Sequence, residues 1–126
     1  DLVFRAEGSH RWFLADYKSN WLGSPRTKEC TVDHYDQPGL IKAMRKGLYV
    51  LQYHLYTVAL HRMLRWRIKD YDYDRHLGGS LYLFLRGMIG KDTPKDADGY
   101  CNGVYFDRPP KARIEALDRL FIDGVS

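Results

Sequence analysis

The stretch DLVFRAEGSHRWFLADYKS, residues 1–19, predicts a β-hairpin. Residues 1–5 and 11–19 are rich in β-branched and aromatic side chains, which favours two strands. The polar stretch AEGSH separates them, and its Gly8-Ser9 pair is typical of a type II′ turn with glycine at the first central position. With a turn of that length, the two strands are expected to pair so that Asp1 faces Asp16.

Asp16 and Lys18 lie two residues apart in the second strand, so their side chains are expected to share one face of the sheet. The strand is otherwise largely apolar, and unpaired charges in such surroundings are costly. Two facing carboxylates repel each other unless one is protonated or a cation binds between them. Mg²⁺ prefers oxygen ligands, and a neighbouring lysine can position the attacking water. Asp1, Asp16 and Lys18 therefore form a minimal set for phosphodiester hydrolysis, although an ordinary hairpin with charges at an exposed edge fits the same spacing.

Three helical segments follow from the apolar periodicity of the remaining sequence. A short helix is predicted over 41–46, with Gly47 breaking it, and a long helix over 48–67. The long helix carries one predicted apolar stripe, made of Leu48, Leu51, Leu55, Val58 or Ala59, Met63 and Trp66. A final helix is predicted over 109–123, because proline is tolerated near a helix start.

Two further strands complete the predicted sheet, over 80–88 and 103–107. The segments 20–39 and 91–102 and the polar stretch KDYDYDRHLGG are expected to be loops or connections. The fold class is therefore α/β, with a mixed central sheet flanked by helices. The helix 48–67 is expected to pack on one face with the last helix beside it, and Leu117, Leu120 and Phe121 are expected to supply part of the cover.

The composition fits one folded domain: the chain has 126 residues, of which 44% are hydrophobic and 14% aromatic. No apolar run approaches the roughly 20 residues that span a bilayer. Cys30 and Cys101 make no C-x-x-C pair, which disfavours zinc and iron–sulfur sites and favours reduced thiols in a cytoplasmic protein. Because Asp1 stands where a start methionine is expected, the chain is expected to be cut from a longer protein.

The charge is unevenly distributed, although the formal net charge is only +4. No acidic residue occurs from Gln37 to Lys69, whereas seven basic residues do: Lys42, Arg45, Lys46, Arg62, Arg65, Arg67 and Lys69. Such a segment could attract DNA, or it could be a solvated helix face balanced by acids elsewhere in the fold. The five histidines are interpreted as surface or structural residues; they are His10, His34, His54, His61 and His76.

The spacing of Asp1 and the motif Asp16-Tyr17-Lys18-Ser19 resembles the signature of the PD-(D/E)XK nucleases, with an acid on one strand and (D/E)-x-K on the next. Three segments resemble the nuclease domain of RecB-type subunits of exonuclease V in order and spacing. They are LADYKSNWLG (14–23), LQYHLYTVALHRMLRWRIKDYDYDRHLGG (51–79) and LYLFLRGM (81–88). The resemblance covers nearly the whole chain and is weakest in the loops.

This resemblance implies a restriction-endonuclease-like core that uses Mg²⁺ to cut DNA. Asp1 and Asp16 would be metal ligands, together with the backbone carbonyl of Tyr17, and Lys18 would orient the water. Gln52 and Tyr56 match the Q-x-x-x-Y helix motif of such nucleases and would support the site or contact DNA. The family joins the nuclease to an ATP-dependent helicase in one chain, which works with RecC- and RecD-type subunits in double-strand-break repair.

The sequence departs from the family pattern in one respect. An additional metal-ligating His or acid usually precedes the first Asp, whereas Asp1 is the first residue here. We therefore expect residues 1–126 to form a single partial nuclease domain, truncated at its N-terminal side, that binds metal weakly and cuts DNA poorly when isolated. The alternative is a nuclease-like module that binds DNA or partner subunits without cutting. The presence of both acids and the lysine favours the enzyme.

Overall fold

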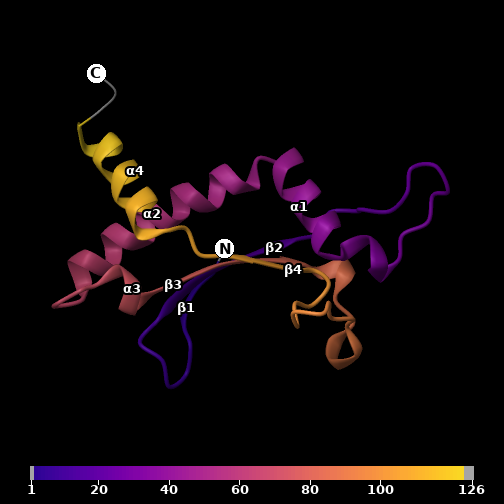
Figure 1. Ribbon diagram of the computed structural model, residues 1–126, viewed down its shortest axis with the longest axis horizontal. Helices are drawn as coiled ribbons and strands as arrows, with labels where there is room; N and C mark the ends of the chain where they lie inside the picture. Colours follow the sequence, from indigo (N-terminus) through magenta and orange to yellow (C-terminus); the bar gives the residue numbers. More distant parts are fainter. Residues whose placement is uncertain (1, 124–126) are drawn as a thin grey trace.

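A single four-stranded mixed sheet forms the centre of the molecule in the computed structural model, which describes residues 2–123 (Figure 1). The strands lie in chain order and comprise β1 (Leu2–Arg5), β2 (Trp12–Lys18), β3 (Leu77–Phe84) and β4 (Val104–Asp107). Strands β2 and β3 are parallel, whereas the two outer pairs are antiparallel. This arrangement confirms the α/β class and the mixed sheet.

The helices α1 (Gln37–Lys46), α2 (Tyr49–Arg67) and α4 (Lys111–Asp123) lie on one side of the sheet (Figure 1). A short helix α3 (Tyr73–His76) precedes β3, and 3-10 turns occupy Val32–Tyr35, Leu85–Gly87 and Gly90–Asp92. Helices α1 and α2 lie in the connection from β2 to its parallel neighbour β3, as parallel strands require. The prediction that the last helix lies beside the long helix on one face is confirmed.

The register of the hairpin is the predicted one, but its turn is not. Leu2 pairs with Ala15 and Arg5 with Trp12, as the predicted spacing requires. The Ser9 amide donates to the Ala6 carbonyl at 3.0 Å, so the turn begins at Ala6 and Gly8 is its second central residue. The type II′ turn is therefore wrong. Gly8 has φ +72°, a value that glycine adopts without steric cost. Asp1 lies outside the described residues.

Helix α1 begins at Gln37, earlier than the prediction placed it. The Asp36 carboxylate accepts a hydrogen bond from the Gly39 amide at 3.0 Å and caps the helix, and Pro38 fits the first turn. The proline and glycine interpreted as loop residues therefore belong to the helix start. The predicted break at Gly47 is confirmed, because the next residue, Leu48, has φ +57°.

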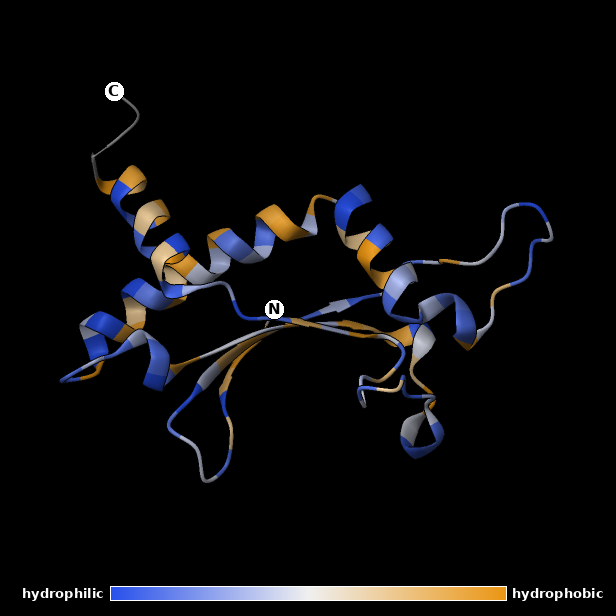
Figure 2. Ribbon diagram, in the orientation of Figure 1, coloured by the Kyte–Doolittle hydropathy of each residue, from blue (hydrophilic) through white to orange (hydrophobic). Residues whose placement is uncertain are grey.

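Helix α2 buries only part of the predicted stripe: Val58 is 3% exposed and Met63 packs against the core. Leu48, Leu51 and Trp66 are 69%, 58% and 84% exposed, and Leu55 is also exposed. The buried residues are Tyr53, Thr57, Val58, Leu60, His61 and Leu64. Three of these six carry polar side-chain atoms, and each of the three side chains has a hydrogen-bond partner inside the fold. A search for apolar letters alone therefore misplaces much of the buried face of a helix that carries apolar residues along much of its length (Figure 2).

Strand β3 runs over Leu77–Phe84, so the predicted 80–88 was shifted towards the C-terminus. Its first residues lie in the stretch interpreted as a connection. Gly79 has φ +132°, and the ring of Phe106 covers the space that a side chain at this position would need. The aromatic ring from the neighbouring strand replaces the missing side chain, which explains why glycine occurs inside a buried strand.

Helix α4 covers the sheet with Ile114, which is fully buried, and with the partly buried Leu117. The predicted contributions of Leu120 and Phe121 are wrong, because both are about half exposed. Within the described residues, no helix is long and apolar enough to cross a bilayer. Both cysteines are free.

Candidate nuclease site

Asp16 and Lys18 form an ion pair at the C-terminal end of β2. Their side chains lie on the helix-covered side of the sheet, and the Lys18 Nζ atom is 3.1 Å from the Asp16 Oδ2 atom. The pair is largely shielded, since the side chains are only 17% and 11% exposed. The alternative of charges at an exposed sheet edge does not fit this burial.

Two tyrosine rings lie beside the Lys18 ammonium group. The Lys18 Nζ atom is 4.2 Å from the centre of the Tyr49 ring and 5.5 Å from that of Tyr82. Tyr49 is the first residue of α2, and Tyr82 stands opposite Asp16 in the neighbouring strand. The sequence interpretation missed both residues, because neither belongs to the motif. Only the register of two strands more than 60 residues apart reveals the position of Tyr82.

Gln52 reaches the site through Tyr82. The Tyr82 hydroxyl donates a 2.6 Å hydrogen bond to the Gln52 Oε1 atom. Tyr82 is only 2% exposed, and this burial, with the nearby Asp16 carboxylate, raises the pKa of Tyr82 above its ordinary value of 10.0. The phenol therefore stays protonated and keeps donating to Gln52 at neutral pH.

Tyr56 lines a cavity of about 270 Å³ that also reaches Asp16. The cavity lies between α2 and the sheet, and its other walls are mainly apolar, with Leu14 and Met63 among them. Tyr56 therefore lies near Asp16, and Gln52 is linked to the same region by its hydrogen bond with Tyr82.

Tyr17 lies between the two charged residues, and its side chain is 52% exposed. Strand alternation turns this side chain to the face opposite Asp16 and Lys18, so only its backbone could serve the site. Within residues 2–123, no three His, Cys, Asp or Glu side chains are grouped as a metal site. The oxygens of Asp16 and of the Tyr17 carbonyl nevertheless are of the type that Mg²⁺ accepts.

Part of the basic segment is neutralised inside the fold. Arg62 and Arg65 of α2 both pair with Asp118 of α4, and Arg65 lies 3.0 Å from its Oδ2 atom. Burial alone would raise the pKa of Asp118, but the two guanidinium groups hold this pKa below its ordinary value. For these two arginines the interpretation of a helix face balanced by acids elsewhere is confirmed. Arg86 donates to the Ser19 carbonyl at 2.8 Å, just after β2.

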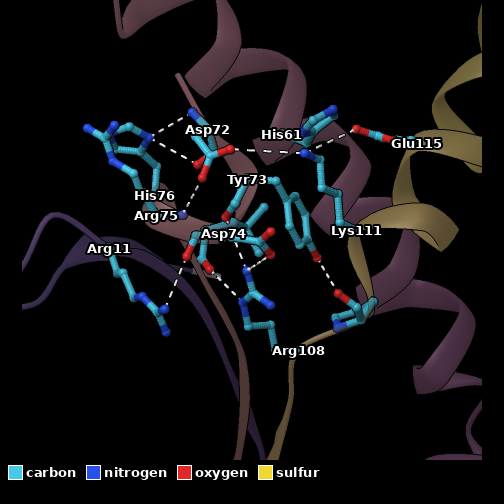
Figure 3. Close-up of polar contacts among 12 residues, drawn as sticks. Arg11, His61, Asp72, Tyr73, Asp74, Arg75, His76, Arg108, Lys111 and Glu115 are labelled. Atoms are coloured by element: carbon cyan, nitrogen blue, oxygen red, sulfur yellow. Dashed lines mark hydrogen bonds and ion pairs between the residues drawn. The ribbon is translucent and has the colours of Figure 1, made fainter. Parts of the chain in front are cut away.

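A polar network lies at the other end of α2 and joins α3, α4 and the start of β3 (Figure 3). Arg108 donates to the Leu77 carbonyl at 2.9 Å and pairs with Asp74 at 3.0 Å. Four histidines have hydrogen-bond partners inside the fold, as their structural interpretation predicted: His34, His54, His61 and His76. The His61 Nδ1 atom lies 2.7 Å from the Tyr71 hydroxyl.

His61 is expected to make the stability of the fold depend on pH. Burial, with the nearby Arg65, lowers the pKa of His61 below 6.5, and Asp118 and Glu115 offset this only in part. The unfolded chain therefore takes up this proton first, so the contribution is present above pH 6.5 and is lost as the pH falls towards the lowered value. We expect His61→Gln to flatten the fall in the free energy of unfolding below pH 6.5, measured by urea denaturation. His10→Gln, at an exposed position, is the control; an equal change in both variants would contradict the assignment.

Several known proteins are similar in sequence to nearly the whole chain, although no family model matches it. The chain is 48% identical over 121 residues to the RecBCD enzyme subunit RecB of Escherichia coli, and 46% identical over 124 residues to that of Mycobacterium tuberculosis. RecB of Haemophilus influenzae is 45% identical over 121 residues. Each match covers at least 96% of this chain.

Over nearly its whole length the chain is similar to RecB. It spans about a tenth of the length of these curated relatives, 9% of the E. coli protein and 11% of the M. tuberculosis protein. The resemblance to RecB-type sequences is thereby confirmed, and the α/β sheet with its helices is consistent with a restriction-endonuclease-like core.

Proposed function

We propose that this RecB-type chain is a metal-dependent nuclease domain that hydrolyses phosphodiester bonds in DNA. The observation that carries the proposal is the shielded Asp16–Lys18 pair, 3.1 Å apart, in a chain similar to RecB. A carboxylate beside an ammonium group at the end of a strand provides an oxygen ligand for a cation and a positive charge for water or phosphate.

Mg²⁺ is the proposed cofactor, held by the carboxylates of Asp1 and Asp16 and by the Tyr17 carbonyl. When bound, it would lower the pKa of a coordinated water and stabilise negative charge on the phosphate. Lys18 would hold the attacking water or a phosphate oxygen, since its ammonium group donates hydrogen bonds and carries no acceptor. Tyr56 would contact DNA or the site from the cavity wall that it shares with Asp16.

The parent protein is proposed to join this domain to an ATP-dependent helicase in the cytoplasm. The relatives are subunits of the RecBCD enzyme by name, so RecC- and RecD-type subunits and DNA are the proposed partners. Double-strand-break repair and recombination are the proposed setting. Residues 1–126 would form a single, partial domain of that longer chain, because they match only about a tenth of each relative.

Removing the metal is the direct test. With Mg²⁺ we expect cleavage of linear DNA, and with EDTA we expect none, because the carboxylate site would then hold no cation to activate water. Restoring Mg²⁺ in excess of EDTA should restore cleavage, measured as product release on a denaturing gel. Cleavage that persists in EDTA would contradict metal dependence. DNA binding without cleavage, in a longer RecB-type chain as well, would favour a non-catalytic module.

The same assay can measure the contribution of sequence before Asp1. We expect a version extended upstream to cleave faster than residues 1–126 alone, because the family resemblance implies a further metal ligand there. Equal rates would contradict the expected weakness of the shorter chain.

A further inference from the structure

We propose that Tyr49 and Tyr82 form an aromatic cage that positions Lys18, and that Asn20 and Gln52 orient the two rings. The catalytic part of this proposal rests on the proposed nuclease function. The cage itself involves only residues of this chain. Tyr49 and Tyr82 are proposed as positioning residues, which act through their contacts with Lys18.

The distances place the ammonium group against both rings. The centre of the Tyr49 ring is 4.2 Å from Lys18 Nζ, and that of Tyr82 is 5.5 Å away, both within the roughly 6 Å range of a cation–π interaction. The two ring centres are 5.8 Å apart, so the rings also pack against each other. Together with the Asp16 carboxylate at 3.1 Å, they surround the end of a side chain that otherwise rotates freely.

Hydrogen bonds hold each ring in place from outside the cage. Asn20, which follows β2, donates to the Tyr49 hydroxyl at 3.3 Å, and Tyr82 donates to Gln52 at 2.6 Å. The ring of Tyr53 packs against Tyr82 with its edge, at a centre distance of 6.0 Å. This arrangement gives Gln52 a specific role: it acts on Lys18 through Tyr82.

The cage explains how Lys18 can stay in place while the Asp16 carboxylate binds a cation. A cation bound to the Asp16 carboxylate would weaken the ion pair that holds Lys18, whereas the aromatic faces would still attract the ammonium group. Aromatic rings neither take up its proton nor compete as ligands for a hard cation. A lysine held only by Asp16 would lose its position when the cation binds, although the hydrolysis that follows needs the lysine in place.

The first test measures the position of Lys18 directly, without any cleavage. Rings stacked on the ammonium end shift the proton resonances of the Lys18 ε-methylene upfield in the NMR spectrum of the chain. We expect Tyr49→Leu to lose most of this shift and Tyr49→Phe to keep it. Tyr105→Leu is the matched control, because Tyr105 packs against the same core as Tyr49 but is not one of the two rings beside Lys18. An unchanged Lys18 resonance in Tyr49→Leu would overturn the cage.

The second test separates ring electrostatics from ring shape. Pentafluorophenylalanine at position 49 has nearly the shape of phenylalanine but a reversed ring quadrupole, so it should behave as Tyr49→Leu does. We expect kcat for DNA cleavage to fall about 3- to 30-fold in both, with KM little changed and Tyr49→Phe close to the unmodified chain. Unchanged kcat, with the Lys18 resonance displaced, would overturn the positioning role. If neither the unmodified chain nor a version extended upstream cleaves DNA, the proposed function fails, and the NMR result still decides whether the cage exists.

Discussion

Asp16→Asn is expected to lower the rate of DNA cleavage by about 10³-fold or more. The substitution keeps the shape of the side chain but removes the negative charge that would hold Mg²⁺ and that pairs with Lys18 at 3.1 Å. Metal-assisted stabilisation of the transition state contributes several kcal/mol, and each 1.36 kcal/mol corresponds to a factor of ten in rate. The measurement is the single-turnover rate of cleavage at saturating Mg²⁺.

Two comparisons make this result specific to Asp16. Asp98→Asn removes an exposed carboxylate from the 91–102 segment and should leave the rate unchanged. DNA binding by Asp16→Asn, measured by gel shift, should persist, because one carboxylate among many surface charges contributes little to the affinity. Cleavage by Asp16→Asn within a few-fold of the unmodified chain would exclude this carboxylate from the chemistry.

Phe84→Ala is expected to lower the free energy of unfolding by about 3–5 kcal/mol. Phe84 is 0% exposed at the end of β3, where its ring belongs to the core cluster that contains Tyr35, Leu40 and Met44. Removing the ring loses apolar burial and leaves a cavity that surrounding side chains fill only in part. Because Tyr82 belongs to the same cluster, the loss should also loosen the support of Lys18.

Urea denaturation of the variant beside Leu85→Ala checks this prediction. Leu85 is the next residue and is 50% exposed, so its truncation should cost at most about 1 kcal/mol. Similar losses in the two variants would mean that the end of β3 is not a core position.

The hairpin and its charged strand could be predicted because they depend on local rules. Strand alternation places Asp16 and Lys18 on one face whatever surrounds them, and the short connection sets the register of β1 against β2. The turn type was wrong because the same register can be reached by a turn that begins one residue earlier, with Gly8 in the second central position. That Asp1 lies opposite Asp16 in the hairpin stays a prediction, since Asp1 lies outside the described residues.

The predicted buried face of α2 was right at Val58 but wrong at Leu48, Leu51, Leu55 and Trp66, and the reason is a different one. Hydrophobic periodicity assumes that buried side chains are apolar, whereas α2 buries Tyr53, Thr57 and His61. Tyr53 donates to Asp107 at 2.6 Å, and burial together with this carboxylate raises the pKa of Tyr53 above its ordinary value. Polar side chains are tolerated inside only when partners from other elements are present, and a single sequence does not show those partners.

The sequence by itself determined the hairpin register, the shared face of Asp16 and Lys18, the α/β class and the resemblance to RecB, because these depend on neighbouring residues and on motif spacing. Only the tertiary structure decided that Tyr82 stands opposite Asp16, that Tyr49 lies over Lys18, and that Gln52 reaches the site through a tyrosine. Those contacts join segments 30 or more residues apart, and their geometry follows from how the parallel strands align and how α2 packs on them. Local patterns carry no information about either alignment.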